Sequence, residues 1–555
     1  MTWENPEPSV GPTHQVLNQP PPLENENLFR RDPVLQELLD LEGASWAQAE
    51  VDDFGKKVGR AETLEWGRLA NRHPPELRTH DRFGHRVDEV EFHPAWHRLM
   101  ALGLEAEIHS LPWNRPGPGA HVARAAKHYL LTQAEAGVLC PITMTFAAVP
   151  ALRSEPDLAE EWIPRITAPT YDFGLRSPAE KSGCLVGMAM TEKQGGSDVR
   201  ANTTLARPVG NSGNTRQYRL TGHKWFCSAP MCDAFLTLAQ TEAGVTCFLV
   251  PRILPDGRRN AFALQRLKEK LGNRSNASSE VEYRDTEAWR VGEEGRGVPT
   301  ILEMVAHTRL DCALGSAALM RQALAQAHHH ASHRHAFGKR LVDQSLMRNV
   351  LADLTLEWEA AARLSLRVAR SYDEAEARGK PRAFRRIATA ISKYWICKRT
   401  PPFVVEALEC HGGNGYVEES ILPRIYREAP LSSIWEGSGN VMCLDVLRAM
   451  GREPETVPAL FEELERAKGS DRRYDAHLVQ LGKALSQRED LEFRARRIVE
   501  GLALGLQGAL LIQHAPSAVA DAFCAARLGG EGGQQYGTLP PGVDAEVILN
   551  RIWSE

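Results

Sequence analysis

The sequence predicts an α+β fold that is mainly α-helical, with one strand-rich domain between helical segments. Three observations lead to this prediction. Residues 30–150 place apolar side chains every three or four positions, as an amphipathic helix does. From about residue 183 the pattern changes to short runs rich in Val, Thr, Phe and Tyr, which Gly, Asn and Pro separate. Helical periodicity then returns after the stretch 291–299.

These changes of pattern divide the chain into four predicted segments. A proline-rich arm and a helical domain occupy 1–182, a β domain 183–297, a helical bundle 298–450 and an extra helical domain 451–555. The most apolar late stretch, 501–513, is too short and too interrupted by Gly and Gln to span a bilayer, so it predicts a buried helix.

Composition limits the classes of function. The chain has 555 residues, 43% of them hydrophobic and 25% charged, as in an ordinary globular protein. A net charge of −5 excludes a globally basic nucleic-acid binder, so any such role needs a local patch. Ten cysteines without a C-x-x-C pair favour reduced thiols. The polar N-terminal arm resembles no signal peptide, so we expect a cytoplasmic protein without a membrane partner.

Two stretches of the β domain contain ligand-binding residue types. "GMAMTEKQGGSDVRANTT" (187–204) places glycines beside hydroxyls, which allow a ligand to approach the backbone and to form directed hydrogen bonds. "HKWFCSAP" (223–230) sets two aromatic side chains near a serine, which could flank a flat cofactor ring. An ordinary strand-to-strand turn and a packed strand explain each stretch equally well when it is taken alone.

Three stretches of the helical bundle have competing interpretations. "HRHAFGKRLVDQ" (333–344) joins cations to a glycine that fits a helix C-cap, and "ECHGGNGYVEE" (409–419) reads as a helix–turn–helix joint rather than a dinucleotide fingerprint. His329 and His333 have metal-ligand spacing on a helix, but no acidic or cysteine partner lies nearby in sequence, so we predict no metal site.

Five stretches occur in one order at spacings that resemble the acyl-CoA dehydrogenase family. They are Thr191–Asp198, Gly222–Ala229, Arg334–Leu341, Glu409–Tyr416 and Trp435–Ser438.

The resemblance covers about residues 60–450. It implies the acyl-CoA dehydrogenase fold, in which an N-terminal helical domain, a middle β domain and a C-terminal helical bundle bind FAD. It also implies a homotetramer with the flavin at a subunit contact.

The resemblance assigns roles to individual residues. Glu436 matches the catalytic base that removes the α-proton of an acyl-CoA thioester while the β-hydrogen leaves as hydride to the flavin. Ser197 and Arg309 match substrate-binding positions, and Arg334 and Phe337 match positions that reach the FAD of a neighbouring subunit. The implied cofactor-binding residues are Met190, Thr191, Ser197, Phe226, Cys227, Ser228, Arg334, Phe337, Gly412, Gly413, Ile434, Trp435, Gly437, Ser438 and Asn440.

Four departures from the family pattern predict weak dehydrogenase activity. Phe226 replaces a tryptophan, Trp435 replaces the tyrosine before the base, and glutamines are replaced by Glu409 and Ser345. We expect FAD binding to persist through these changes and long acyl chains to be oxidised poorly.

Within the family, the chain is most similar to flavoproteins of the adaptive response to DNA alkylation. The similarity extends through 139–150, 267–282 and 432–448 to the extra C-terminal block. It implies a role in defence against alkylation damage, with duplex DNA as a partner.

The extra block holds one locally basic part. Residues 451–555 contain 12 basic and 16 acidic residues, whereas 466–497 contain 9 basic and 5 acidic ones. A solvated amphipathic helix also explains this charge. Without a recognition-helix or zinc-finger pattern, DNA contact would be to phosphates and independent of sequence. The predicted DNA-binding residues are Arg472, Arg473, Lys483, Arg494, Arg496 and Arg497.

Three functional classes therefore remain open from the sequence. They are an oxidoreductase acting on short or branched acyl-CoA thioesters, a DNA-binding protector of the genome, and a flavoprotein that inactivates alkylating agents. We expect the second, combined with weak acyl-CoA dehydrogenase activity.

Overall fold

The N-terminal domain is built mostly from helices. The computed structural model describes residues 14–210, 216–377 and 382–553, so the first part of the arm (1–13) lies outside it. The first helix begins at Pro33 because Asp32 caps it, accepting a hydrogen bond from the Leu35 amide at 2.8 Å. The helices are α1 (Pro33–Leu41), α2 (Gln48–Val58), α3 (Ala61–Arg72), α4 (Pro94–Glu105), α5 (Leu111–Asn114), α6 (Ala120–Ala134), α7 (Leu139–Leu152) and α8 (Pro156–Ile166).

A β-hairpin interrupts this domain, so the prediction that 30–150 is helical was wrong for 76–91. Strands β1 (Glu76–His80) and β2 (Arg86–Glu91) pair antiparallel. Asp81 fixes the turn by accepting hydrogen bonds from the amides of Phe83 and His85. The Arg86 guanidinium donates to the Leu264 carbonyl of strand β8, so the hairpin is anchored on the middle domain.

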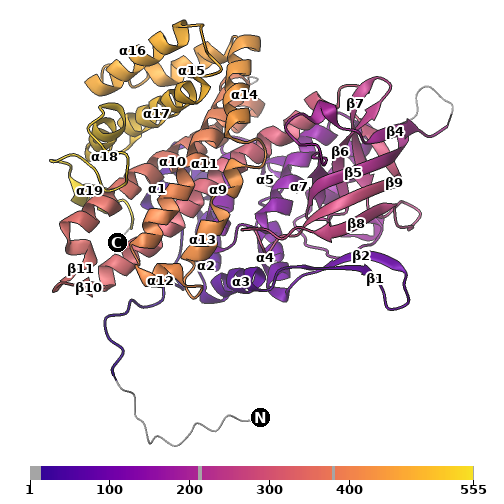
Figure 1. Cartoon of the computed structure of the whole chain (residues 1–555), viewed down its shortest axis with the longest axis horizontal. Coiled ribbons are helices and arrows are strands. Elements are labelled where there is room, and N and C mark those ends of the chain that lie inside the picture. Colours follow the sequence, from indigo (N-terminus) through magenta and orange to yellow (C-terminus); the bar gives the residue numbers. More distant parts are fainter. Residues whose placement is uncertain (1–13, 211–215, 378–381, 554–555) are drawn as a thin grey trace, which may run out of the picture.

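The middle domain is a sheet of seven strands among the described residues, with the order β3-β6-β4-β5-β9-β7 and β8 paired to β9. Strand β3 runs parallel to β6, whereas β5, β7 and β8 are each antiparallel to β9. Figure 1 shows this sheet at one end of the molecule. The strands are β3 (Val186–Ala189), β4 (Leu205–Pro208), β5 (Gln217–Ser228), β6 (Ala234–Thr241), β7 (Gly244–Pro251), β8 (Phe262–Leu267) and β9 (Ser278–Val291).

Long helices form the bundle that follows the sheet. The largest is α9 (Gly297–His333), whose buried Asp311 forms an ion pair with Arg124 of α6 and so joins the two helical domains. The hairpin β10 (His335–Ala336) and β11 (Lys339–Arg340) leads into the next helix. The remaining helices are α10 (Ser345–Ala377), α11 (Ala383–Glu409), α12 (Gly413–Tyr416), α13 (Leu422–Glu428) and α14 (Gly439–Arg452).

The extra C-terminal helices pack on this bundle, at the end of the molecule away from the sheet (Figure 1). Helix α17 includes the predicted buried segment, which confirms that it is helical and buried. Buried Arg367 of α10 pairs with Glu463 of α15 at 2.6 Å, and Trp395 of α11 donates to Gln507 at 2.9 Å. The added helices are α15 (Thr456–Glu465), α16 (Arg472–Ser486), α17 (Ala495–His514), α18 (Ser517–Phe523) and α19 (Ala545–Leu549).

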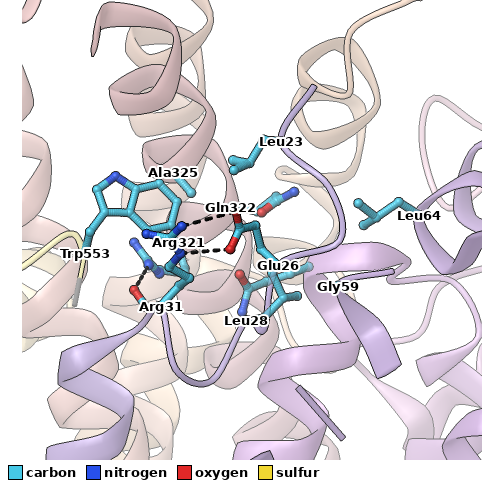
Figure 2. Close-up of a pocket in the computed structure, with 11 residues that line it drawn as sticks. Leu23, Glu26, Leu28, Arg31, Gly59, Leu64, Arg321, Gln322, Ala325 and Trp553 are labelled. Carbon is cyan, nitrogen blue, oxygen red and sulfur yellow. Dashed lines mark hydrogen bonds and ion pairs between the residues drawn. The ribbon is translucent and has the colours of Figure 1, made fainter. Parts of the chain in front are cut away.

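A small pocket lies where the N-terminal arm meets α9 and the C-terminal Trp553 (Figure 2). Arg31 donates to Glu26 at 2.9 Å, and buried Arg321 donates to the Arg31 carbonyl at 2.8 Å. Arg321 also pairs with Asp32 at 3.2 Å. These contacts hold the N-terminal segment against α9, and the Arg321 guanidinium also lies over the C-terminal Trp553 ring, 5.0 Å from its centroid.

All ten cysteines are buried and none forms a disulfide. Among the described residues, no helix is long and apolar enough to cross a membrane.

Candidate active site

The turn before α14 holds Glu436 in an unusual backbone conformation. Glu436 has φ +58°, a left-handed value that costs a non-glycine residue about 1–2 kcal/mol. Two cations on neighbouring helices fix this turn. Arg309 of α9 donates to the Glu436 carbonyl at 2.9 Å, and Lys393 of α11 donates to the carbonyls of Trp435 and Gly437. The bundle therefore sets the direction of the Glu436 side chain.

Among the described residues, the Glu436 carboxyl has one hydrogen-bond partner. The Thr308 hydroxyl donates to Oε2 at 2.7 Å. Burial raises the pKa of Glu436 above its ordinary value, although Thr308 and the charges of Arg309 and Lys393 all favour the carboxylate. A carboxyl with a raised pKa on a fixed turn is suited to act as a general base.

Arg309 is part of the framework of the site. Its Nη1 donates to Asp445 of α14 at 2.9 Å, and Arg386 also donates to Asp445 at 2.8 Å. Burial opposes ionisation of Asp445, but the two guanidinium groups hold its pKa below the usual range. Arg309 therefore joins α9 to α14, and its role toward substrate stays a prediction.

Buried Glu192 organises the glycine-rich turn after β3. It accepts hydrogen bonds from the amides of Thr203 and Thr204 at 2.6 and 3.1 Å, and from the ammonium of buried Lys224 at 2.9 Å. Burial alone would raise the pKa of Glu192, but Lys224 and these donors lower it below the ordinary value. A Cβ at Gly196 would approach Thr191 Oγ1 to 2.3 Å, so this turn requires glycine.

Unsatisfied polar groups lie beside the predicted flavin-binding serine. Ser228 on β5 is opposite Ser278 on β9, and Lys270 donates to Ser278 at 3.0 Å. The buried Asn276 side chain has no nitrogen or oxygen hydrogen-bond partner in the described part of the chain and makes only a weak contact with the Cys140 thiol. Buried polar groups are normally paired, so Asn276 indicates a ligand with its own donors and acceptors, such as a flavin ring.

An aromatic platform adjoins these polar groups. Phe226 is 51% exposed, and its neighbour Trp225 lies under the Lys268 ammonium, 3.2 Å from the ring centroid. Met190 is half-buried, whereas Cys227 is fully buried in the domain core, so its side chain packs behind the platform. The exposed ring and the unpaired amide together fit a flat heterocycle such as an isoalloxazine.

Several predicted cofactor residues lie on the surface of the single chain. Phe337 is 97% exposed, and Arg334 donates to the Asn18 carbonyl of the N-terminal arm at 2.7 Å. Gly412 and Gly413 are exposed with free space beside them. Their exposure in the single chain agrees with contact to a neighbouring subunit's cofactor, which stays a prediction.

The residues after Glu436 open helix α14. Ser438 is the N-cap but makes no side-chain cap hydrogen bond, and Asn440 lies in the first turn. Ile434 is 63% exposed, and the buried Trp435 Nε1 has no partner in the described chain. Asn440 Oδ1 accepts a hydrogen bond from Arg496 of the extra domain at 2.9 Å.

The predicted DNA-binding residues fall into two groups. Arg472, Lys483 and Arg497 are exposed and form no ion pair with another described residue.

The other three members, Arg473, Arg494 and Arg496, have partners inside the protein, and Arg496 donates to Asn440. Arg473 pairs with Asp471 and Asp521 at 2.6 and 2.5 Å. Arg494 donates to the carbonyls of Ala484, Gln487 and Glu489 and so caps the end of α16.

His329 and His333 do share a face of α9, with ring centroids 4.4 Å apart. His329 hydrogen-bonds the Pro21 carbonyl at 2.8 Å. The described residues contain no group of three or more metal-ligating side chains.

The sequence did not indicate four further residues at the site. They are Thr308, Lys393, Lys270 and Asn276. Lone residues in long helices or loops carry no pattern, although Thr308 could have been noticed beside Arg309.

Comparisons with known proteins show which family the chain belongs to. Residues 18–173 match the AidB N-terminal domain, 187–286 the acyl-CoA dehydrogenase middle domain and 295–451 its C-terminal domain. AidB of Escherichia coli (strain K12) is 48% identical over 523 residues, covering 94% of this chain and 95% of that protein. The chain belongs to the acyl-CoA dehydrogenase family.

More distant relatives agree with this assignment. Acyl-CoA dehydrogenase family member 11 of Caenorhabditis elegans is 30% identical over 538 residues, covering 88% of this chain and 84% of that protein. The crystal structure of ACDH-11 from the same organism, in complex with C11-CoA, has a TM-score of 0.84 at 28% identity. It covers 98% of this chain and 93% of that one. The predicted acyl-CoA dehydrogenase fold of the present chain is confirmed. The chain is an oxidoreductase of this family.

Proposed function

We propose that this acyl-CoA dehydrogenase family member binds FAD and acts, like AidB, in defence against DNA alkylation through sequence-independent duplex binding. Weak oxidation of acyl-CoA thioesters accompanies this role. The observation that carries the enzymatic part is the Glu436 turn, fixed by Arg309 and Lys393, with a raised pKa at its carboxyl.

The chain's own residues would position the proton transfer. Glu436 would accept the α-proton of a bound thioester at its carboxylate, while Thr308 holds Oε2 in place. Trp435 adds bulk beside the base and favours short or branched acyl groups. FAD, held by the glycine-rich turn and the Ser228 region, would supply the hydride acceptor.

Flavin release tests the cofactor proposal. Boiled protein should release yellow FAD into the supernatant, because hydroxyl, guanidinium and amide groups line the site and no covalent attachment is expected. A colourless preparation from flavin-replete cells would contradict it. Anaerobic bleaching of the flavin by a short branched acyl-CoA then tests the thioester as substrate.

The exposed cations of α16 and α17 support the DNA-binding part. Arg472 and Lys483 are eleven residues apart on α16, which places them on one face of the helix. Duplex titrations at several salt concentrations test this part, because phosphate contacts give a linear loss of affinity with log salt. Flavin-dependent loss of an alkylating agent in a DNA-free mixture would instead favour direct inactivation of the agent.

The proposed assembly is a homotetramer with the flavin at a subunit contact. Large apolar side chains are exposed at, or close in sequence to, the positions predicted to reach a second flavin: Phe337, Leu346, Tyr416 and Val417. Their exposure in one chain supports a homotetramer. Sedimentation analysis should give the mass of four chains, and a monomer would contradict this proposal.

A further inference from the structure

A hydrogen bond joins the extra C-terminal domain to the predicted cofactor end of α14. Arg496, in the first turn of α17, donates through Nε to Asn440 Oδ1 at 2.9 Å. A Cβ at Gly439 would lie 3.6 Å from Arg496 Nη2 and 2.9 Å from Cε of Lys398. Two cationic side chains from different helices therefore surround the first turn of α14.

Neither of these cations forms an ion pair with an acidic side chain of the described chain, although Glu500 lies one turn after Arg496 on α17. Neither α14 nor α17 has an acidic residue in its first turn, and neither N-cap side chain makes a cap hydrogen bond. Arg496 and Lys398 are exposed and form no ion pair in the described part of the chain. Helix amino ends carry partial positive charge, so cations are unfavourable there unless an anion binds nearby.

Helix α17 is held firmly against the bundle. Trp395 of α11 donates to buried Gln507 of α17 at 2.9 Å. The face of α17 that carries Ile498, Leu502 and Leu506 is buried in the common core. The position of Arg496 is therefore fixed by packing of the extra domain.

We infer that Arg496 is a positioning residue for the FAD phosphates. It orients the Asn440 amide and adds positive charge beside the diphosphate, so the extra domain completes the cofactor site. The inference rests on the proposed FAD binding. Arg496 was predicted from the sequence to contact DNA, and the inference assigns its guanidinium to the cofactor instead.

Flavin affinity of the full-length protein tests the inference. We expect Arg496→Gln to weaken FAD binding to the apoprotein about five- to tenfold, as measured by flavin fluorescence, because one charge-assisted hydrogen bond is lost. The FAD affinity of Arg496→Lys should lie between those of the parent and of Arg496→Gln, since lysine keeps the charge but loses the Nε contact. The Arg496→Gln effect should shrink at high salt.

Two controls separate this role from a general effect on folding. Arg488→Gln removes the same charge from an exposed position of the extra domain and should leave FAD affinity unchanged. Arg496→Gln should reduce FAD affinity less in the Asn440→Ala background than in the parent. The reason is that Arg496 acts partly through Asn440.

The outcomes are distinguishable. A parent protein that binds no FAD would contradict the proposed function itself. A parent that binds FAD, with unchanged affinity in folded Arg496→Gln or equal weakening in Arg488→Gln, would overturn only this inference. Equal additive losses in the double variant would also overturn it.

Discussion

Glu436 combines two features that are individually unfavourable. Its backbone lies in the left-handed region, and burial opposes the charged form of its side chain. Bonds from Arg309 and Lys393 to the neighbouring carbonyls offset the backbone cost. Strain and a raised pKa on the same residue are characteristic of functional positions.

Glu436→Gln should abolish thioester-dependent flavin reduction while FAD stays bound. The amide keeps the shape of the side chain but cannot accept the proton, and loss of a positioned base costs ~10²–10⁴ in rate. Stopped-flow absorbance under anaerobic conditions measures this step. Parental reduction rates in the variant would assign Glu436 a purely structural role.

Thr308→Val should move the pH profile of the same step toward higher pH. The hydroxyl stabilises the carboxylate of Glu436, so its removal raises the pKa of that group further. The active base is the deprotonated form, which then appears only at higher pH. At pH values below the pKa of both proteins, the variant's rate should be about tenfold lower than the parent's.

Thr308→Ser is the matched control, because it keeps the hydroxyl. It should retain the parental pH profile. Equal profiles for the parent and Thr308→Val would show that this hydrogen bond does not tune the base.

At the scale of elements, Glu192 fixes the conformation of the glycine-rich turn after β3. Its carboxylate joins the turn after β3 to Lys224 of β5 and to the amides that precede β4. The family motif therefore contains a structural acid next to Thr191, whose hydroxyl is predicted to face the flavin.

Glu192→Gln should lower the free energy of unfolding by roughly 3–5 kcal/mol, since it leaves the buried Lys224 without its counter-charge. Denaturant unfolding followed by circular dichroism measures the change. Asp256→Asn, which removes an exposed partner of Arg258, should leave the midpoint unchanged. Equal midpoints for both variants would contradict the role of Glu192.

At the scale of the whole molecule, the extra domain shares its core with the family bundle. Its contacts with α10, α11 and α14 leave one face of α16 and the start of α17 exposed. This exposed face is where we expect DNA phosphates.

Replacing Arg472, Lys483 and Arg497 together with glutamine should weaken duplex binding and leave the flavin spectrum unchanged. Each lost phosphate contact should reduce the steepness of the plot of log affinity against log salt concentration by roughly 0.9. Fluorescence anisotropy with labelled duplexes of unrelated sequence measures both affinity and slope.

The matched control replaces Arg72, Arg82 and Arg207, three exposed arginines of the N-terminal and middle domains, with glutamine. It should retain the parental slope. If both triple variants behave alike, the DNA site lies elsewhere, and a parent that binds no duplex would leave only the oxidoreductase function.

The sequence by itself determined the order of helical and β segments, the family, the turn that holds Glu436, and the glycine-rich stretch. Periodicity and motif spacing are local properties, so they can be read along the chain. The hairpin β1–β2 was missed because its stability depends on its anchor to the Leu264 carbonyl, which lies 178 residues away from Arg86.

Only the tertiary structure decided which basic side chains of the extra domain lack partners among the described residues. It also decided which residues fix the Glu436 turn. Arg473, Arg494 and Arg496 look like Arg472 and Arg497 in the sequence, but the folded chain pairs them with carboxylates, carbonyls and Asn440. Lys393 reaches the Glu436 turn across 42–44 residues of chain. Such pairings depend on how helices pack, and packing brings together residues whose distance along the chain carries no signal.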